Sequence, residues 1–254
     1  MAFPILMYGS VPASGHEGVG AAIPLDLVDR QWQALRAEGW VLTGLTEALM
    51  HARGYPNLRV AAVTFDEGYA DFARVPELLD RHQAQATLYL GTANLGEEWR
   101  PGQRWLSWPE VAALPDDLVE LGCNAHHHRP LDVLPAAEVE DEVHQSRSLI
   151  KERLGIKPVS FCYPNGYLSA SVIDTVRGAD YENGCIIGRR LADPYGDPLA
   201  LPRLQVRAEH DEDGILKLVA KGEPGPIPKL KRAAFPYWRA VRKGVYRTTG
   251  VTLT

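Results

Sequence analysis

Cysteine is scarce in this 254-residue sequence, and its three copies, Cys123, Cys162 and Cys185, lie far apart in apolar, strand-like segments. An odd number of widely spaced cysteines argues against a disulfide framework and a zinc-cysteine site, so we expect buried free thiols. Long apolar runs are also missing. The opening segment, MAFPILMYGS, lacks the basic residues that begin a signal peptide, and its apolar run is too short for one. No later stretch is long and apolar enough to cross a bilayer. We therefore expect a cytoplasmic protein.

An excess of positive charge is absent as well, since the formal net charge is −5, which argues against a nucleic-acid-binding protein. The charge is uneven, however. From Lys221 onward, eight Lys or Arg residues accompany one acidic residue, Glu223, and the linker-like GEPGPIP occupies residues 222–228. We interpret residues 222–254 as a basic C-terminal tail, a helix packed on or extending from the main domain. The simpler interpretation is that the basic residues of this helix face solvent. The alternative is that they contact an acidic partner or an anionic membrane.

The rest of the chain, residues 1–221, has the length and the apolar content for one large α/β domain. Short apolar runs alternate with segments whose apolar residues recur three and four apart, which predicts βαβ units around a parallel sheet. Seven strand candidates favour a barrel over a flat sheet. The predicted strands are Ile5–Tyr8, Val60–Phe65, Ala86–Leu90, Val119–Asn124, Ser160–Tyr163, Cys185–Gly188 and Leu204–Val206, and the predicted helices are Leu25–Glu38, Ala70–His82, Ala136–Leu154 and Ser169–Arg177.

Two adjacent carboxylates, Asp66 and Glu67, end a predicted strand in the segment VTFDEGYADF. Catalytic groups collect at the carboxyl ends of strands in parallel barrels. Neighbouring strand residues point in opposite directions, so one carboxylate can bind a metal while the other reaches a reacting water. The alternative is an acidic pair that caps a helix.

Three consecutive histidines follow another strand in LGCNAHHHRPLDVL. Side chains of His, Asn or acidic residues spaced four apart on a folded loop can converge on one divalent ion. A histidine triplet alone is usually a solvated loop, but its position at a second strand end favours a metal site.

A third segment, FCYPNGYLS, places Pro164 and Gly166 in a turn after a strand. Such a turn can present backbone N–H groups to a developing oxyanion, or it can simply connect a strand to a helix.

These segments, in this order, resemble the polysaccharide deacetylase family, that is, carbohydrate esterase family 4 or the NodB-homology domain. The resemblance begins at PILMYGSV and continues through TLYLGTANLG and RWLSWPEVAAL to LPRLQVR. It implies a distorted (β/α)7 barrel with parallel strands and the removal of acetyl groups from N-acetylated sugars.

The resemblance also implies roles for individual residues. Asp66 matches the general base. Glu67, Asn124 and His128 match the three metal ligands, the metal being zinc in most members. Asn165, in the turn that begins with Tyr163 and Pro164, matches the backbone oxyanion donor. We expect Tyr163, Pro164, Arg203 and His126 to contact the substrate. Arg203 matches a residue that orients a carboxylate, or else forms a structural ion pair.

This chain departs from the family pattern at three positions. Glu67 and Asn124 stand where the family has Asp and His, so we expect weaker zinc binding and a site compatible with Mn²⁺, Co²⁺ or Mg²⁺. His126, ahead of His127, is the candidate to supply the missing imidazole, because strand alternation places it on the same face as Asn124 and His128. Gly9 stands where a histidine protonates the leaving amine, and His16 on the following loop is a weak substitute.

The favoured hypothesis is a metal-dependent hydrolase that removes an acetyl or related acyl group from an amino sugar or a small glycosylated metabolite. One alternative is proton abstraction or elimination by Asp66 in the same cleft, which the loss of the histidine at Gly9 motivates. Another is a catalytically inactive sugar-binding homologue, which the three departures motivate.

Overall fold

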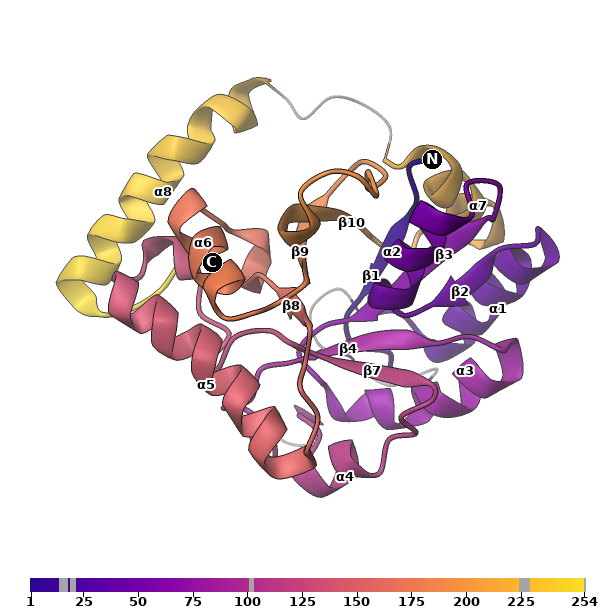
Figure 1. Ribbon diagram of the computed structural model, residues 1–254, viewed down its shortest axis with the longest axis horizontal. Helices are drawn as coiled ribbons and strands as arrows, with labels where there is room; N and C mark the ends of the chain where they lie inside the picture. Colours follow the sequence, from indigo (N-terminus) through magenta and orange to yellow (C-terminus); the bar gives the residue numbers. More distant parts are fainter. Residues whose placement is uncertain (14–17, 19–21, 101–102, 224–228, 254) are drawn as a thin grey trace.

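The computed structural model describes residues 1–13, 18, 22–100, 103–223 and 229–253, without the side chains of residues 99–100 and 229–236. Within these residues, seven parallel strands close into a barrel (Figure 1). Each strand pairs with the next in the ring order β1-β3-β4-β7-β8-β9-β10, and β10 returns to β1. The expectation of a (β/α)7 barrel is therefore confirmed. The strands are β1 (Ile5–Tyr8), β3 (Val60–Phe65), β4 (Ala86–Leu90), β7 (Val119–Cys123), β8 (Ser160–Cys162), β9 (Asn183–Gly188) and β10 (Leu201–Gln205).

Strand β3 is the most enclosed part of the barrel, and all six of its residues are buried. It pairs with β1 over Ala62–Phe65. The short strand β2 (Val41–Thr43) pairs with its first half, and β4 pairs with its second half. The sequence VAAVTF suits such a position, because small and β-branched residues pack well on both faces of a buried strand. The carboxyl end of β3 therefore presents Asp66 from a rigid support.

Helices surround the barrel on both sides (Figure 1). The helices α1, α2, α3 and α7 cover one side, and α5, α6 and α8 cover the other. A hairpin of β5 (Glu98–Arg100) and β6 (Gln103–Arg104) lies outside the ring. The helices are α1 (Leu25–Ala37), α2 (Leu45–Gly54), α3 (Val75–His82), α4 (Trp108–Ala112), α5 (Ala136–Leu154), α6 (Ala170–Gly178), α7 (Glu212–Lys221) and α8 (Lys229–Thr249), with 3-10 turns η1 (Ala70–Arg74), η2 (Leu131–Val133), η3 (Pro164–Gly166) and η4 (Pro198–Ala200).

The prediction of a single α-helix over Ala70–His82 is wrong. The segment divides into the 3-10 turn η1 and the α-helix α3, which begins at Val75 with Pro76 in its first turn. Proline has no N–H to donate and its ring clashes with the preceding turn, so it is accommodated only where a helix begins.

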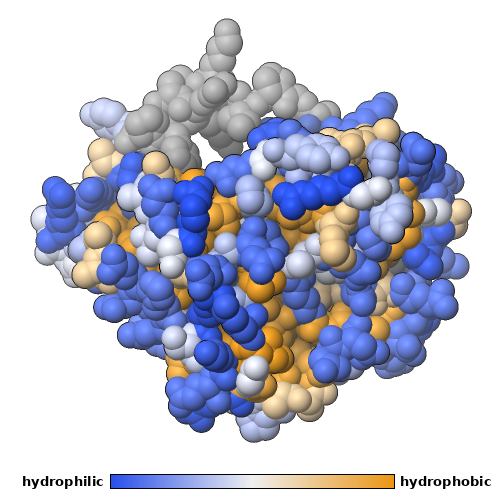
Figure 2. All heavy atoms as spheres, viewed as in Figure 1, coloured by the Kyte–Doolittle hydropathy of each residue, from blue (hydrophilic) through white to orange (hydrophobic). Residues whose placement is uncertain are grey.

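Polar and charged side chains cover much of the face seen in Figure 2, and apolar surface is visible between them. Inside, Tyr8 stacks on Phe65, and Trp32 packs edge-on against both. The three cysteines are free and buried, as the sequence predicts. Among the described residues, none of the helices combines the length and the apolar character needed to span a bilayer.

Helix α8 is held against the barrel by one buried ion pair. The Arg242 guanidinium donates two hydrogen bonds to the Asp132 carboxylate, 3.0 and 2.8 Å long, and neither side chain is exposed. Arg242 also lies 3.7 Å from the ring centre of Tyr167, a cation–π arrangement. The Tyr246 hydroxyl donates to Glu138 in the first turn of α5. The division of the chain at residue 222 stays a prediction.

Candidate active site

Asp66 forms a buried, bidentate ion pair with Arg203. Asp66 directly follows β3 and Arg203 lies in β10, and the two nitrogen–oxygen distances are 2.5 and 2.8 Å. The Arg203 side chain is 1% exposed, whereas Asp66 is 19% exposed. Burial alone would lower the pKa of Arg203, but the Asp66 carboxylate raises it well above its usual value. The pair therefore holds an accessible carboxylate in one orientation.

A thiol lies beside this pair. The Cys162 sulfur is 3.0 Å from Arg203 Nη2 and 3.8 Å from Asp66 Oδ1. Burial raises the pKa of Cys162 well above its usual range. A protonated thiol is a poor nucleophile, so Cys162 serves as packing beside the carboxylate.

Glu67 and His128 approach each other across the mouth of the barrel. Glu67 Oε1 is 4.0 Å from His128 Nε2, and the Tyr69 hydroxyl donates a 2.6 Å hydrogen bond to Glu67 Oε2. Burial, and then the Glu67 charge, raises the pKa of Tyr69, so its hydroxyl remains a donor. Glu67 and His128 both have left-handed backbone angles, with φ of 69° and 56°. Non-glycine residues adopt these angles at some energetic cost, and such residues concentrate at functional sites.

Six of the predicted residues line one cavity of about 160 Å³ at the carboxyl end of the barrel. We call it the barrel cavity. Gly9 and Tyr69 also line it. Sequence reasoning missed Tyr69, although its position directly after the Asp-Glu-Gly turn could have indicated it. The six predicted residues are Asp66, Glu67, His128, Tyr163, Asn165 and Arg203.

The turn η3 depends on left-handed angles at Asn165 and Gly166, with φ of 57° and 71°. A Cβ atom at Gly166 would lie 2.9 Å from the side chain and the backbone nitrogen of Ile187, so a larger residue would not fit. The turn therefore brings the backbone of Asn165 to the cavity, while Pro164 lies buried in the same turn outside the lining.

Asn124 is completely buried, and both polar atoms of its side chain lack a hydrogen-bond partner within the described residues. It follows β7 and its backbone N–H donates to Leu90, but it is not among the residues that line the barrel cavity. An unpaired buried amide costs about 1–3 kcal/mol, so its persistence calls for a partner such as a water or an ion.

His126 and His127 turn away from the barrel cavity. The His126 ring lies 2.8 Å from Thr92 Oγ1, and burial lowers its pKa. His127 Nδ1 lies 2.9 Å from the buried carboxylate of Glu142. Left-handed angles at Ala125 and His128 break the extended backbone on which strand alternation depends. A contact of His126 with substrate stays a prediction, and His16 lies outside the described residues.

The donors at this site fit a divalent cation. Two atoms that share a zinc ion lie about 2.0–2.2 Å from it and hence at most about 4.4 Å apart, a limit that the 4.0 Å between Glu67 Oε1 and His128 Nε2 satisfies. The unpartnered amide of Asn124 offers an oxygen as well, although Asn124 does not line the barrel cavity. In the described part of the chain, no three side chains of His, Cys, Asp or Glu are grouped as metal ligands. Glu67, Asn124 and His128 offer a single imidazole, so this group of donors has fewer imidazoles than a typical zinc site.

Gly9, at the end of β1, leaves room in the barrel cavity. A Cβ atom built on Gly9 meets no atom within 4 Å, and its backbone does not require glycine. The position therefore accepts a side chain, although this sequence supplies none.

Solved structures with the same fold come from several bacteria. The deacetylase PplD of Streptococcus pyogenes, in complex with acetate, has a TM-score of 0.77 at 19% identity, and the match covers 88% of this chain and 99% of that one. A de-N-acetylase of Aggregatibacter actinomycetemcomitans has a TM-score of 0.74 at 16% identity over 85% and 99%. IcaB of Ammonifex degensii has a TM-score of 0.72 at 21% identity over 86% and 96%. At these identities the likeness establishes the fold.

Curated proteins include no match to this chain. The family model described as polysaccharide deacetylase matches residues 53–184, which is more than half of the sequence and includes the segments around Asp66, His128 and Asn165. The chain therefore belongs to the polysaccharide deacetylase family.

Proposed function

We propose that this protein is a divalent-metal-dependent hydrolase that removes an acetyl or related acyl group from an amino sugar or a small glycosylated metabolite. Membership of the deacetylase family supports a deacetylase-like hydrolase acting on C–N bonds. The single observation that carries the proposal is the accessible Asp66 carboxylate, held by the buried Arg203 in the same cavity as Glu67 and His128.

Asp66 is the proposed general base. The oxygen of a water forms a bond to the acyl carbon while its proton passes to Asp66. Arg203 keeps the carboxylate aimed at that water, since two hydrogen bonds fix the plane of the group. The C–N bond then breaks, the amine takes up a proton from solvent while Asp66 releases its proton to solvent, and the products are a carboxylate and the free amino sugar.

Glu67, Asn124 and His128 are the proposed metal-holding residues, with Tyr69 orienting Glu67 through its hydrogen bond. A divalent cation bound there supplies Lewis-acid polarisation of the acyl carbonyl and a lower pKa for water. Family resemblance favours Zn²⁺, and the oxygen-rich donors are compatible with Mn²⁺, Co²⁺ or Mg²⁺. The backbone N–H of Asn165, beside Tyr163 and Pro164, is the proposed donor to the oxyanion.

The absence of an acid at Gly9 limits the proposed reaction. Amine departure without a positioned proton donor is slower by a factor of about 10² to 10⁴, so we expect low turnover on acetamides. A cytoplasmic location and a small carbohydrate substrate remain part of the proposal.

The experiment is acetate release from a panel of N-acetylated sugars by purified protein supplied in turn with Zn²⁺, Mn²⁺, Co²⁺ or Mg²⁺. We expect release with at least one ion and loss of release after removal of the ion with a chelator. Asp141→Asn, which changes an exposed carboxylate on α5, should leave the rate unchanged, whereas Asp66→Asn should lower it by a factor of about 10² to 10⁴. Absence of acetate with every ion and sugar would overturn the proposal.

A further inference from the structure

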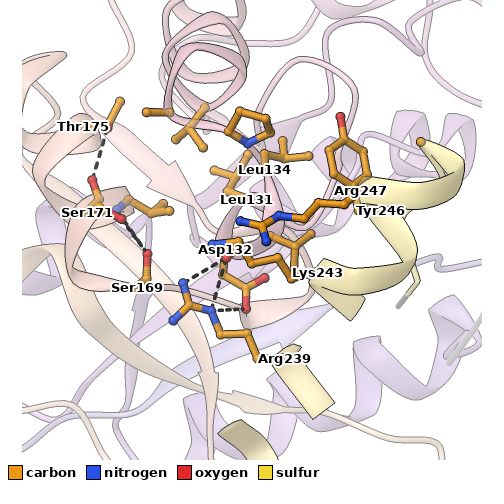
Figure 3. A pocket seen from close by; sticks show the side chains of 16 residues that line it. Leu131, Asp132, Leu134, Ser169, Ser171, Thr175, Arg239, Lys243, Tyr246 and Arg247 are labelled. Atoms are coloured by element: carbon orange, nitrogen blue, oxygen red, sulfur yellow. Dashed lines mark hydrogen bonds and ion pairs between the residues drawn. The ribbon is translucent and has the colours of Figure 1, made fainter. Parts of the chain in front are cut away.

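A second, larger cavity lies between α8 and the starts of α5 and α6 (Figure 3). Its volume is about 620 Å³. We call it the α8 cavity. Its walls continue the two loops of the barrel cavity, because Leu131 comes three residues after His128 and Ser169 comes three residues after Gly166. Three positions in each loop therefore separate the linings of the two cavities in the sequence.

The α8 cavity has cations without matching anions. Lys243 and Arg247 line it, and neither has a carboxylate within ion-pair distance among the described residues. Arg239 also lines it, but it is already paired, because it donates to the Asp132 carbonyl at 3.0 Å and lies 3.5 Å from the Asp132 carboxylate. Asp132 is the only acidic residue of the described lining, and Arg242 already neutralises it from outside that lining.

Nearby carboxylates do not compensate these charges. Glu138, in the first turn of α5, is bound by Arg129 at 2.9 Å and by the Tyr246 hydroxyl. The first turn of α6 contains no acidic residue. Its N-terminus carries partial positive charge, the Ser169 hydroxyl caps it by accepting from the Val172 N–H, and the Ser171 hydroxyl lies beside it. These groups add donors to the charge of α8.

The remaining wall is apolar and includes Leu131, Leu134, Val139 and Val172. Cavities of 300–1,000 Å³ with a mostly apolar lining and a few converging polar groups are typical of small-molecule sites. An inorganic anion alone would leave most of this volume unfilled. The ligand should combine an anionic group with a larger organic part.

We propose that the α8 cavity binds the phosphate or diphosphate group of the substrate, so that the substrate is an N-acylated sugar phosphate rather than a neutral sugar. A phosphate carries a charge of about −1.5 to −2 and several acceptor oxygens, which match two unpaired cations and the α6 N-terminus better than a single carboxylate does. The acyl-sugar part of this inference rests on the proposed function, whereas phosphate binding does not.

Isothermal titration with the full chain carrying Asp66→Asn measures binding without turnover. The probes are N-acetylglucosamine 1-phosphate, N-acetylglucosamine and inorganic pyrophosphate, at low and high salt. We expect the sugar phosphate to bind at least about tenfold more tightly than the neutral sugar, and that advantage to shrink at high salt. Binding of pyrophosphate alone supports the site as well. Equal affinity for the charged and neutral sugars, together with no binding of pyrophosphate, would overturn the inference.

Two double variants that remove the same charge test whether the phosphate group binds in the α8 cavity. Lys243→Met with Arg247→Met should remove the preference for the sugar phosphate. Lys151→Met with Lys217→Met, on the exposed faces of α5 and α7, removes the same charge and should leave the preference intact. Equal losses in both double variants would overturn the inference, and thermal melting checks that each variant is folded. A second experiment uses anionic phospholipid vesicles to distinguish a lipid phosphate from a sugar phosphate. Binding of the vesicles without binding of the sugar phosphate would also overturn the inference.

The two proposals fail in different ways. If the sugar phosphate binds through Lys243 and Arg247 but no acetate is released with any metal ion, then the proposed function fails while the phosphate site stands. If acetate is released equally from charged and neutral sugars, then the phosphate site fails while the proposed function stands.

Discussion

Two buried arginine–aspartate pairs of nearly the same geometry have different surroundings in this molecule. In each, two guanidinium nitrogens meet two carboxylate oxygens, at 2.5 and 2.8 Å for Arg203–Asp66 and at 3.0 and 2.8 Å for Arg242–Asp132. Asp66 is 19% exposed and lines the barrel cavity, whereas the Asp132 side chain is wholly buried beneath α8. The same kind of ion pair therefore orients an accessible carboxylate, the proposed general base, in one place and joins a helix to the barrel in the other. The access of the carboxylate to ligands decides between these roles.

The largest expected effect is on the accessible pair. Asp66→Asn should lower the rate of acetate release by a factor of about 10² to 10⁴, because the amide oxygen cannot take the proton of the water. Steady-state kinetics with the preferred metal ion measures it. Asp132→Asn, the matched change in the other pair, should leave kcat on a neutral sugar within about threefold of the parent, since general-base catalysis does not involve Asp132. Similar losses of kcat in both variants would contradict the proposed difference in role between the Arg203–Asp66 pair and the Arg242–Asp132 pair.

The next largest expected effect is a loss of protein stability when the Arg242–Asp132 pair is broken. Asp132→Asn leaves Arg242 buried without a counter-charge and should destabilise the protein by about 3–5 kcal/mol, a fall of roughly 10 °C in Tm. Calorimetry measures it. The double variant Asp132→Leu with Arg242→Met should recover most of the lost stability, because apolar side chains can replace a buried pair at little net cost. Absence of recovery would mean that the pair does more than attach α8.

A substitution at Gly9 tests whether the barrel cavity lacks a proton donor for the leaving amine. Gly9→His adds an imidazole to the barrel cavity as a candidate acid for the proposed reaction and should raise acetamide hydrolysis by about 10²-fold, the lower end of general-acid catalysis. Hydrolysis of 4-nitrophenyl acetate should not change, because its leaving group needs no proton. Gly54→His, at an exposed glycine with equal free space, is the control. Parallel changes for both substrates would show that the histidine acts by something other than protonation.

The smallest expected effect concerns Tyr69, which orients Glu67. Tyr69→Phe removes one hydrogen bond and should weaken metal binding about tenfold, the lower end for the loss of a group that positions a ligand. Metal titration measures it, with activity at saturating metal nearly restored. Tyr55→Phe, at an exposed tyrosine, should have no effect. Unchanged metal affinity in Tyr69→Phe would remove Glu67 from the proposed ligands.

Local sequence was sufficient for several elements. Ser107 and Glu110 have the spacing of a capping box, and they form one at the start of α4, because both partners lie within one helical turn. Strands β1, β3 and β4 have the predicted bounds. Each is a short apolar run between turn residues, and burial inside a parallel barrel requires such a run. Pro76 could have corrected the helix prediction over Ala70–His82, since its effect is local too.

The sequence by itself determined which residues end the strands, and hence that Asp66, Glu67, His128 and Asn165 belong to one edge of a barrel. Only the tertiary structure decided their partners. Arg203 lies 137 positions from Asp66 and Arg242 lies 110 positions from Asp132, so no local pattern links them. The burial of Asn124, the outward turn of His126 and the cations of the α8 cavity follow from how distant segments pack. An ion pair, an orphaned amide or a ligand cavity depends on neighbours that only folding brings together.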